Sequence, residues 1–490
     1  MNIRRTKIVA TLGPATDNPV QLEQLIRAGV NVVRLNFSHG HPEDHRQRAS
    51  LVREISEKLQ RTVAILGDLQ GPKIRIARFA TGPVQLAIGD QFILDAMLDQ
   101  NVGDQTHVGI DYKQLPEEVN PGDRLLLDDG RVVLQVIKIE GARIVTQVQV
   151  AGTLSNNKGI NREGGGLSAA ALTDKDLRDI ELAAEIDVDY LAVSFVRSAD
   201  DIEQARALLQ QAGGSAGVVA KIERAEAVSD NSVLEKIIRT SDAIMVARGD
   251  LGVEIGDAEL MAVQKSMIRQ ARRFNKSVIT ATQMMESMIS NSLPTRAEVF
   301  DVANAVLDGT DAVMLSAETA AGNFPVETVA AMHRIIVGAE RYPQAQTANQ
   351  LSPFDYNRAD EAIAMACIHT ANGMPSVRAI ICLTETGHTP LLMSRVSTSI
   401  PIFAFTRTKK TERWVVLYRG VNPIKLADLP DSSDDLIDRA ITQLLEREIV
   451  FPNDTVIVSK GDHKDVHGGT NTMKIIDVKN VRMELHHSKT

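Results

Sequence analysis

Stretches of continuous apolar residues recur along the chain, and each ends in glycine, hydroxyl or charged residues. Continuous rather than alternating apolarity is typical of parallel strands that are covered on both faces. The pattern predicts eight strands, within residues 6–16, 31–40, 62–71, 188–198, 217–226, 241–255, 277–288 and 310–322.

Between these stretches, apolar residues recur at helical spacing, and several of the segments end in glycine, which is a normal helix stop. The spacing predicts helices at 18–29, 42–60, 173–186, 200–213, 233–239, 258–275, 295–309 and 325–340. Eight strand–helix units with short links favour a (β/α)8 TIM barrel, an α/β fold. The loops that follow the strands build the active site of such a barrel, so polar residues at strand ends indicate chemistry.

One strand–helix unit is interrupted, because the helix that should follow the third strand begins only near Thr173. A gap of roughly a hundred residues is too long for a structureless loop in a compact domain. Residues 90–98 and 123–150 resemble strands, with hairpin turns at Asp129-Gly130 and Glu140-Gly141. We therefore expect a small β-barrel or sandwich inserted at the rim, where it can act as a lid.

A polar, proline-containing stretch at 342–360 resembles a linker, and beyond it strand and helix patterns alternate again. This predicts a separate C-terminal α/β regulatory domain. The domain limits that we expect are 1–70 and 168–340 for the catalytic barrel, 71–167 for the lid and 341–490 for the C-terminal domain.

Composition narrows the class of protein. A chain of 490 residues with 43% apolar and 24% charged residues is typical of a globular protein with several domains. A net charge of −9 argues against nucleic acid as the main partner. No apolar run is long enough to span a bilayer or to act as a signal sequence. Cys367 and Cys382 lie far apart, which indicates neither zinc nor a disulfide framework, so we expect a cytoplasmic location.

Two acids at the ends of consecutive strands, Glu223 and Asp250, suggest a metal site. Neighbouring strands are about 5 Å apart, so both carboxylates can reach one hard divalent ion such as Mg²⁺. Arg34, Arg75 and Lys221 would face an anion that bridges from this metal. Such a combination suits phosphoryl transfer, in which catalysis is mostly charge neutralisation and positioning.

Simpler interpretations stand beside these. Any single acid–base pair at a strand end is as often a structural salt bridge, and we take Arg248 as structural. His39 is as easily a turn residue as a nucleotide contact. The triple glycine Gly164–Gly166 follows no predicted strand and lacks the Walker pattern, so it is a weak candidate for a phosphate loop.

The chain resembles the pyruvate kinase family in motifs that occur in the family's order: KIVATLGPAT, NVVRLNFSHG, GDLQGPKIR, NNKGIN, AKIERAEAV, VARGDLGVEI, ITATQMMESM, PTRAEV and DAVMLSAETAAG. The resemblance implies transfer of the phosphoryl group of phosphoenolpyruvate to ADP in glycolysis, giving pyruvate and ATP. The C-terminal domain resembles the family more loosely, in its length and strand order.

By this resemblance, Glu223 and Asp250 hold the divalent ion, Mg²⁺, for which Mn²⁺ is expected to substitute. Lys221 stabilises the transferring phosphoryl group. Gly249, Asp250 and Thr282 receive the substrate carboxylate, and Thr282 also lies near the proton that is delivered to the enolate carbon.

The resemblance also implies that Arg34 and Arg75 contact phosphates and that Lys158 reaches ADP when the lid closes. Further nucleotide contacts are expected from Asn36, His39 and Pro14. Ser316 and Glu318 are expected to orient a proton-relay water.

A monovalent-cation site is implied as well, made of Asn36, Ser38, Asp68 and the Leu69 carbonyl. Potassium-requiring members have an acidic residue where this chain has Lys73, and a threonine-lysine pair in place of Leu69-Gln70. Because an ammonium group can supply the charge of the ion, we expect turnover without potassium, as in a lysine-containing bacterial subgroup.

A hydroxyl-rich turn opens a helix in the C-terminal domain, which is typical of a phosphate nest. It consists of Thr384, Thr386, Gly387, His388 and Thr389. The family binds a phosphorylated effector in this region, so the resemblance implies allosteric activation by a sugar phosphate or nucleotide. His388 replaces the commoner arginine, which leaves the identity of the effector open.

Two other classes of protein fit parts of the pattern. A metal-dependent barrel lyase or aldolase acting on pyruvate-like acids would use the same two acids but has no use for Lys158. A non-catalytic regulatory protein should have lost Lys221, Glu223 or Asp250, and all three are present. The family forms homotetramers, so we expect a homotetramer here.

Overall fold

The computed structural model describes residues 3–342, 356–426, 433–461 and 468–481. The chain divides into two compact units. The first consists of Met1–Gly67, Ile186–Tyr190 and Ile268–Thr490, and the second of Asp68–Glu185 and Leu191–Met267.

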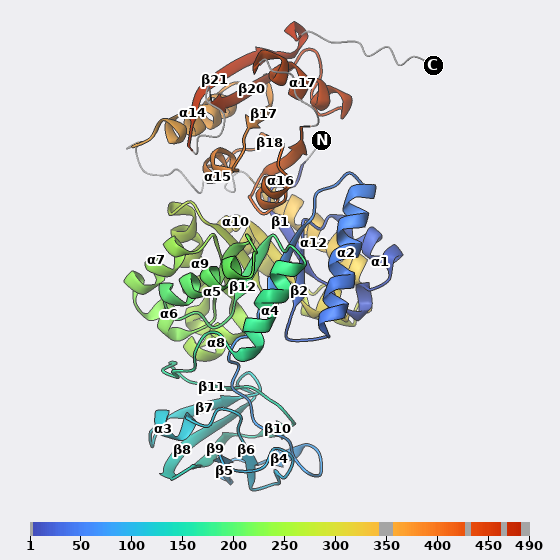
Figure 1. Cartoon of the computed structure of the whole chain (residues 1–490). Coiled ribbons are helices and arrows are strands. Elements are labelled where there is room, and N and C mark those ends of the chain that lie inside the picture. The colour runs from blue at the N-terminus through green and yellow to red at the C-terminus, as the bar shows by residue number, and fades with distance from the viewer. Residues whose placement is uncertain (1–2, 343–355, 427–432, 462–467, 482–490) are drawn as a thin grey trace. The chain divides into compact units, whose positions relative to one another are not determined.

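Eight parallel strands form a closed barrel in the order β1-β16-β15-β14-β13-β12-β3-β2. Each lies within one of the eight predicted apolar stretches, so the predicted barrel is confirmed (Figure 1). All residues of β1, β3, β14 and β15 are buried, which explains the continuous apolarity of these stretches. The strands are β1 (Lys7–Thr11), β2 (Val32–Asn36), β3 (Ala64–Asp68), β12 (Tyr190–Val193), β13 (Gly217–Ile222), β14 (Ala243–Ala247), β15 (Ser277–Ala281) and β16 (Ala312–Leu315).

The helices between these strands begin and end where the sequence places its caps. Thr295 and Glu298 form a reciprocal capping box at the start of α10, and Gly309, with φ of 92°, ends that helix. The helices are α1 (Pro19–Ala28), α2 (Pro42–Lys58), α4 (Asp174–Glu185), α5 (Ala199–Gln211), α6 (Ala225–Ser229), α7 (Asn231–Thr240), α8 (Arg248–Ile255), α9 (Asp257–Arg273), α10 (Arg296–Asp308), α11 (Ala317–Ala320) and α12 (Pro325–Glu340), with short 3₁₀ turns η1 (Pro14–Thr16) and η2 (Glu286–Ile289).

The segment inserted after β3 forms a six-stranded sheet in the order β11-β7-β8-β9-β5-β6 and a two-stranded sheet of β10 and β4. Antiparallel pairing of β7 with β8 and of β8 with β9 confirms both predicted hairpins. Phe92, Leu94 and Leu134 belong to a core of its own. The elements are β4 (Val84–Leu86), β5 (Gln91–Asp95), β6 (His107–Gly109), α3 (Leu115–Glu118), β7 (Arg124–Leu127), β8 (Val132–Glu140), β9 (Arg143–Val150), β10 (Gly152–Leu154) and β11 (Ile160–Arg162).

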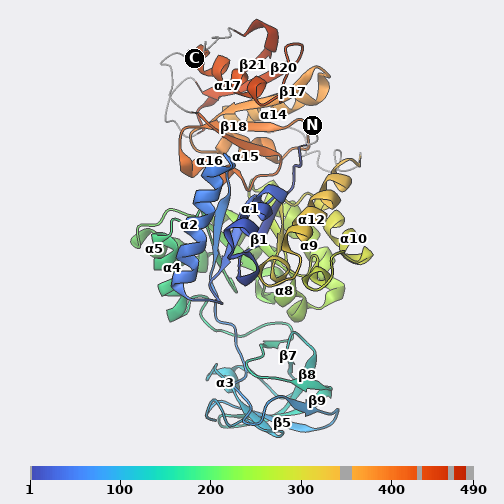
Figure 2. The same ribbon diagram turned by 90° about the vertical axis from the view of Figure 1, so that its right-hand side faces the viewer.

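The C-terminal α/β domain contains a five-stranded sheet in the order β19-β18-β17-β20-β21, in which only β21 is antiparallel. Helices α14 and α15 pack against it, as Figure 2 shows. Most of the predicted linker, 343–355, lies outside the described residues, and the expected domain limits stay predictions. The elements are α14 (Ala359–Gly373), β17 (Val377–Leu383), α15 (His388–Ser394), β18 (Ile402–Thr406), α16 (Lys409–Val415), β19 (Val421–Lys425), α17 (Ser433–Glu446), β20 (Thr455–Gly461), β21 (Thr470–Asp477) and the 3₁₀ turn η3 (Val478–Asn480).

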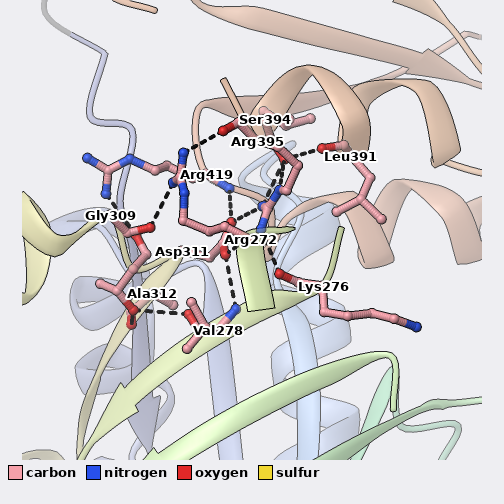
Figure 3. Close-up of polar contacts among 12 residues, drawn as sticks. Arg272, Lys276, Val278, Gly309, Asp311, Ala312, Leu391, Ser394, Arg395 and Arg419 are labelled. Carbon is pink, nitrogen blue, oxygen red and sulfur yellow. Dashed lines mark hydrogen bonds and ion pairs between the residues drawn. The ribbon is translucent and has the colours of Figure 1, made fainter. Parts of the chain in front are cut away.

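A buried cluster of charged side chains joins this domain to the barrel strands of the first unit (Figure 3). Arg395, which directly follows α15, forms two contacts with the Asp311 carboxylate, one of them Nη1 to Oδ2 at 3.1 Å. The same carboxylate accepts hydrogen bonds from the backbone N–H groups of Val278 at 3.0 Å and Arg419 at 2.9 Å. Asp311 therefore holds together the beginnings of β15 and β16 and two segments of the C-terminal domain.

Among the helices in the described part of the chain, none is both long enough and apolar enough to cross a membrane.

Candidate active site

Lys221, near the end of β13, is the centre of a buried polar cluster in the second unit. Its ammonium Nζ lies 2.9 Å from Glu223 Oε1 and 3.2 Å from Asp68 Oδ1, and it donates to Ser194 Oγ at 2.7 Å. Only 12% of its side chain is exposed, against 3% for Glu223 and 1% for Asp68. The Ser194 hydroxyl in turn donates to the Leu69 carbonyl at 2.7 Å. The cluster thus fixes the lysine between two carboxylates.

Asp250 lies in the first turn of α8. Its Oδ1 forms an ion pair with Lys73 Nζ at 2.9 Å, and Lys73 is also 3.8 Å from Asp129. The start of a helix carries backbone N–H groups without helical partners, and these favour an anion.

Charge and burial shift the ionisation of this cluster. Burial raises the pKa of the Glu223 carboxyl; Lys221 opposes this, and the neighbouring Asp250 carboxylate raises the pKa further. Burial lowers the pKa of the Lys73 ammonium, but the charge of Asp250 and its hydrogen bond outweigh burial, so the pKa stands above its usual value. The Asp250 carboxylate therefore disfavours the charge of Glu223, which a cation between the two groups would relieve.

The chemistry of these groups fits Mg²⁺, which is commonly bound through one or two carboxylates, with water and substrate oxygens as the other ligands. Glu223 Oε2 is held by the backbone N–H of Phe195 at 2.8 Å, which fixes the orientation of its carboxylate. Within the described residues, no group of three or more His, Cys, Asp or Glu side chains is arranged to hold a metal ion by itself.

The predicted nucleotide residues of the second unit lie on the inserted segment and its first connection. Arg75 Nη1 donates to the Asn157 carbonyl at 3.0 Å, so this side chain is turned toward the NNKG turn. Lys158, in that turn, forms an ion pair with Asp128 at 2.7 Å. Both cations belong to one region of the insertion.

The first unit carries the other predicted residues of the N-terminal strands. Arg34, on β2, is buried and donates to Thr11 Oγ1 at 3.1 Å. Asn36 ends β2, and its Oδ1 accepts from the Ser38 N–H at 3.1 Å. His39 and Pro14 are exposed, in the loop after β2 and at the start of η1.

Thr282 and Gln283, directly after β15, have φ of 63° and 55°. A β-branched residue with positive φ is a genuine backbone outlier, and such strain clusters at functional sites. Phe195, which follows β12, has φ of 54°.

Glu318, after β16, is buried and accepts hydrogen bonds from Ser316 N–H at 2.6 Å and Met285 N–H at 3.2 Å. Its carboxylate therefore braces the loop after β15 against the loop after β16. Burial raises its pKa, and these backbone bonds oppose the rise.

The predicted effector turn lies between β17 and α15. Thr384 Oγ1 accepts from the Gly387 N–H at 2.9 Å, and the Thr389 and Thr470 hydroxyl oxygens are 2.6 Å apart. His388 Nε2 lies 3.3 Å from the buried Asp360 carboxylate, so a carboxylate stands beside this turn.

Sequence reasoning missed Ser194 and the backbone N–H of Phe195, although both lie within the predicted stretch 188–198, just after β12 ends. A single serine in the stretch SFVRS carries no spacing signal, and a backbone donor has no signature in the side chains at all. The position in the barrel was the only available clue.

An eight-stranded parallel barrel with acids and lysines clustered after its strands defines a (β/α)8-barrel protein whose candidate site lies at the carboxyl ends of the strands. The family models for the pyruvate kinase barrel domain and the pyruvate kinase alpha/beta domain match residues 3–329 and 361–476.

Curated relatives and a solved structure agree with these models. Pyruvate kinase II of Salmonella typhimurium is 57% identical over 97% of this chain and 99% of its own length. Pyruvate kinase of Haemophilus influenzae is 57% identical over 94% and 96%. The crystal structure of a pyruvate kinase from Cryptosporidium parvum superposes with a TM-score of 0.88 at 34% identity, covering 97% of this chain and 96% of that one. The chain belongs to the pyruvate kinase family and is a phosphotransferase.

Proposed function

We propose that this protein transfers the phosphoryl group of phosphoenolpyruvate to ADP, with uptake of a proton, giving pyruvate and ATP. The observation that carries the proposal is the pairing of the Lys221 ammonium with the buried carboxylates of Glu223 and Asp68, with the Asp250 carboxylate near enough to raise the pKa of Glu223. Phosphoryl transfer needs this combination, because its catalysis is mostly positioning and charge stabilisation.

Glu223 and Asp250 would hold Mg²⁺, or Mn²⁺ in its place. The metal, when bound, neutralises the charge of substrate and phosphoryl oxygens. Lys221, already fixed by Asp68 and Ser194, would stabilise the phosphoryl group as it transfers.

The remaining roles concern the substrates and a proton. The backbone at Gly249 and Asp250, with Thr282, would receive the substrate carboxylate, and Thr282 would stand near the enolate carbon that gains the proton. Ser316 and Glu318 would orient a water that supplies this proton. Arg34, Arg75 and Lys158 would contact phosphates, with Asn36, His39 and Pro14 as further nucleotide contacts.

A coupled assay for pyruvate formed from phosphoenolpyruvate, with and without ADP, tests the function. We expect ADP-dependent pyruvate, and a loss of about a thousandfold in Lys221→Met, since preorganised charge stabilisation is worth this much. Lys138→Met, at an exposed pair with Glu140, is the matched control and should keep wild-type activity. Pyruvate formed equally fast without ADP would indicate hydrolysis of the phosphate ester, with water in place of ADP as the acceptor, and would overturn the proposal.

Turnover is proposed to need no potassium, because Lys73 brings a fixed positive charge to Asp250, 2.9 Å away. The proposed monovalent site would comprise Asn36, Ser38, Asp68 and the Leu69 carbonyl. Its Asp68 is already paired with Lys221. Rates measured in potassium-free buffer should rise less than about tenfold when potassium is added, which is a barrier change below about 1.4 kcal/mol. A larger rise would refute the idea.

A phosphorylated effector, a sugar phosphate or a nucleotide, is proposed to bind at Thr384, Thr386, Gly387, His388 and Thr389. Substrate-saturation curves titrated with such metabolites should shift to lower substrate concentration. The response should disappear when Thr384 and Thr389 are replaced by glutamate, and its survival would place the site elsewhere.

The protein is also proposed to be a homotetramer, which sedimentation analysis tests. A cytoplasmic location is proposed as well.

A further inference from the structure

The last N–H group of the triple glycine Gly164–Gly166 binds an anion, and this anion belongs to the protein. All three residues are left-handed, with φ of 79°, 78° and 92°. The Gly166 N–H donates to Glu226 Oε1 at 2.5 Å. A Cβ atom placed on Gly165 would lie 2.7 Å from Glu226 Oε2. The weak phosphate-loop signal in the sequence thus corresponds to a glycine turn in which one N–H binds a carboxylate, while the N–H groups of Gly164 and Gly165 bind the carbonyls of Glu254 and Arg162.

Arg224 fastens the same carboxylate to the end of the inserted segment. Its Nη2 donates to Glu226 Oε1 at 3.0 Å and to the Leu167 carbonyl at 2.7 Å, and its side chain is 5% exposed. Although burial raises the pKa of Glu226, the Arg224 charge and backbone N–H groups lower it below its usual value, so the group is an anion.

Glu254, on α8, makes a second attachment to this segment. Its carboxylate Oε1 accepts from Asn161 Nδ2 at 3.2 Å, and its backbone carbonyl accepts from the Gly164 N–H at 2.9 Å. The other carboxylate oxygen, Oε2, accepts from the Ala225 N–H at 2.8 Å. The return segment of the insertion, Asn161–Leu167, is therefore held from two directions.

The two attachments come from the elements that carry the proposed metal ligands. Arg224 is the residue after Glu223, and Glu254 shares α8 with Asp250. Lys158, the proposed nucleotide contact, lies three positions before Asn161 on the same short stretch of chain. A shift of the return segment therefore moves Lys158 relative to the phosphoryl-transfer groups of the same unit.

We propose that Arg224, Glu226 and Glu254 are positioning residues, a latch that fixes the return segment of the insertion and so sets the place of the nucleotide-binding lysine. The inference rests on the proposed function and deepens it, because it names the residues on which affinity for the nucleoside diphosphate depends. In the described part of the chain, the hydrogen bonds given above for Arg224, Glu226 and Glu254 go to the return segment, to one another or to Ala225, so we expect their loss to affect the two substrates differently.

Two neighbouring glycines provide a matched test. Gly164 and Gly165 have nearly the same left-handed φ, so the backbone strain of an alanine is nearly the same at the two positions. The methyl group of Gly165→Ala would collide with Glu226, whereas no atom lies within 4 Å of a Cβ placed on Gly164. We expect Gly165→Ala to raise KM for ADP about tenfold, a change of about 1.4 kcal/mol. Its KM for phosphoenolpyruvate should stay within about twofold. Gly164→Ala should change both constants less than about twofold.

Two further variants test the same proposal without a change at Gly165, in case Gly165→Ala folds poorly. Glu226→Gln keeps the shape but loses the charge, and should reproduce the selective rise in KM for ADP. Arg224→Lys keeps the charge but loses the guanidinium Nε, which lies 3.4 Å from Glu226 Oε2 and 3.7 Å from Glu254 Oε1, so an intermediate rise is expected. Amide hydrogen exchange at Gly166 should accelerate in Glu226→Gln, with the unfolding temperature close to wild type.

The proposal is overturned if Gly165→Ala matches Gly164→Ala in KM for ADP, or if both substrate constants rise together. It is also overturned if exchange at Gly166 is unchanged in Glu226→Gln. A wild-type protein that forms no ADP-dependent pyruvate would overturn the proposed function instead, and the exchange measurement would still decide whether the latch exists.

Discussion

Single residues show most clearly what a sequence can and cannot specify. The acids Glu223 and Asp250 were predicted from their places after consecutive strands, and the structure finds both in one charged cluster. The pairing of each lysine with its acid was not predictable from the sequence. A lysine side chain has several rotamers, and the rotamer it adopts decides which carboxylate its ammonium group reaches. Lys221 rather than Lys73 contacts Asp68, and Lys73 contacts Asp250. Their roles stay predictions.

Glu254 gives a prediction about pH at the same scale. Burial raises its pKa from 4.5 to about 7. The folded state therefore binds this proton more tightly than the unfolded state, and the free energy of unfolding falls as the pH rises from about 4.5 to about 7. Glu254→Gln should flatten this part of the curve, measured by denaturant unfolding at a series of pH values.

The control for Glu254 is Glu163→Gln, because Glu163 is exposed and pairs with Arg124. This variant should keep the wild-type slope between pH 4.5 and 7. Parallel curves for wild type and Glu254→Gln would show that Glu254 does not titrate in this window.

Among the elements, the long apolar strands were predictable and the short ones were not. Buried parallel strands leave a continuous signal, which is why each barrel strand was found. The strands β4, β6, β10 and β11 have three residues each, too few for a period-2 pattern. The left-handed Gly256, with φ of 86°, separates α8 from α9. The predicted helix at 258–275 corresponds to α9, and no limits were predicted for the shorter α8.

Glu318 braces two loops, and removing it should loosen both. In Glu318→Ala the N–H groups of Ser316 and Met285 lose their acceptor, at a cost of about 1–3 kcal/mol for each buried donor. We expect kcat to fall at least about tenfold. Glu318→Gln, which keeps one acceptor oxygen, should lose less.

Steady-state kinetics with hydrogen exchange at Met285 measure the effect. Glu327→Gln, at an exposed position on α12, is the control and should behave as wild type. Wild-type kcat in Glu318→Ala would exclude the bracing role.

At the scale of the whole molecule, several arginines of the first unit donate hydrogen bonds to backbone carbonyls at or just beyond the C-terminal ends of barrel helices. Arg4 donates to the carbonyl of Gly29 after α1, and Arg272 to that of Gly309 after α10. Arg395, from the C-terminal domain, donates to the Lys276 carbonyl beyond α9. Cations at helix C-termini complement the helix dipole. Sequence showed only scattered arginines, because these partners are carbonyl groups and leave no trace in residue type.

Asp311 is the one carboxylate in the cluster drawn in Figure 3, and Asp311→Asn should destabilise the fold by about 3–5 kcal/mol. The reason is that Arg395 would keep a buried charge without its counter-ion. Denaturant unfolding measures the change.

Arg378→Met breaks the exposed pair with Asp454, 3.5 Å apart, and serves as the matched control. Its loss should cost less than about 1 kcal/mol. Equal losses in the two variants would contradict the importance of the buried cluster.

The inserted sheet is attached to the barrel by two chain segments, one leaving after β3 and one returning before α4. Because its apolar core is its own, this sheet takes no apolar side chain from the barrel strands for its packing. What couples the inserted segment to the helices after the strands is instead polar, through Lys73 and the return segment Asn161–Leu167. Raising the salt concentration should therefore weaken this coupling while both apolar cores stay folded.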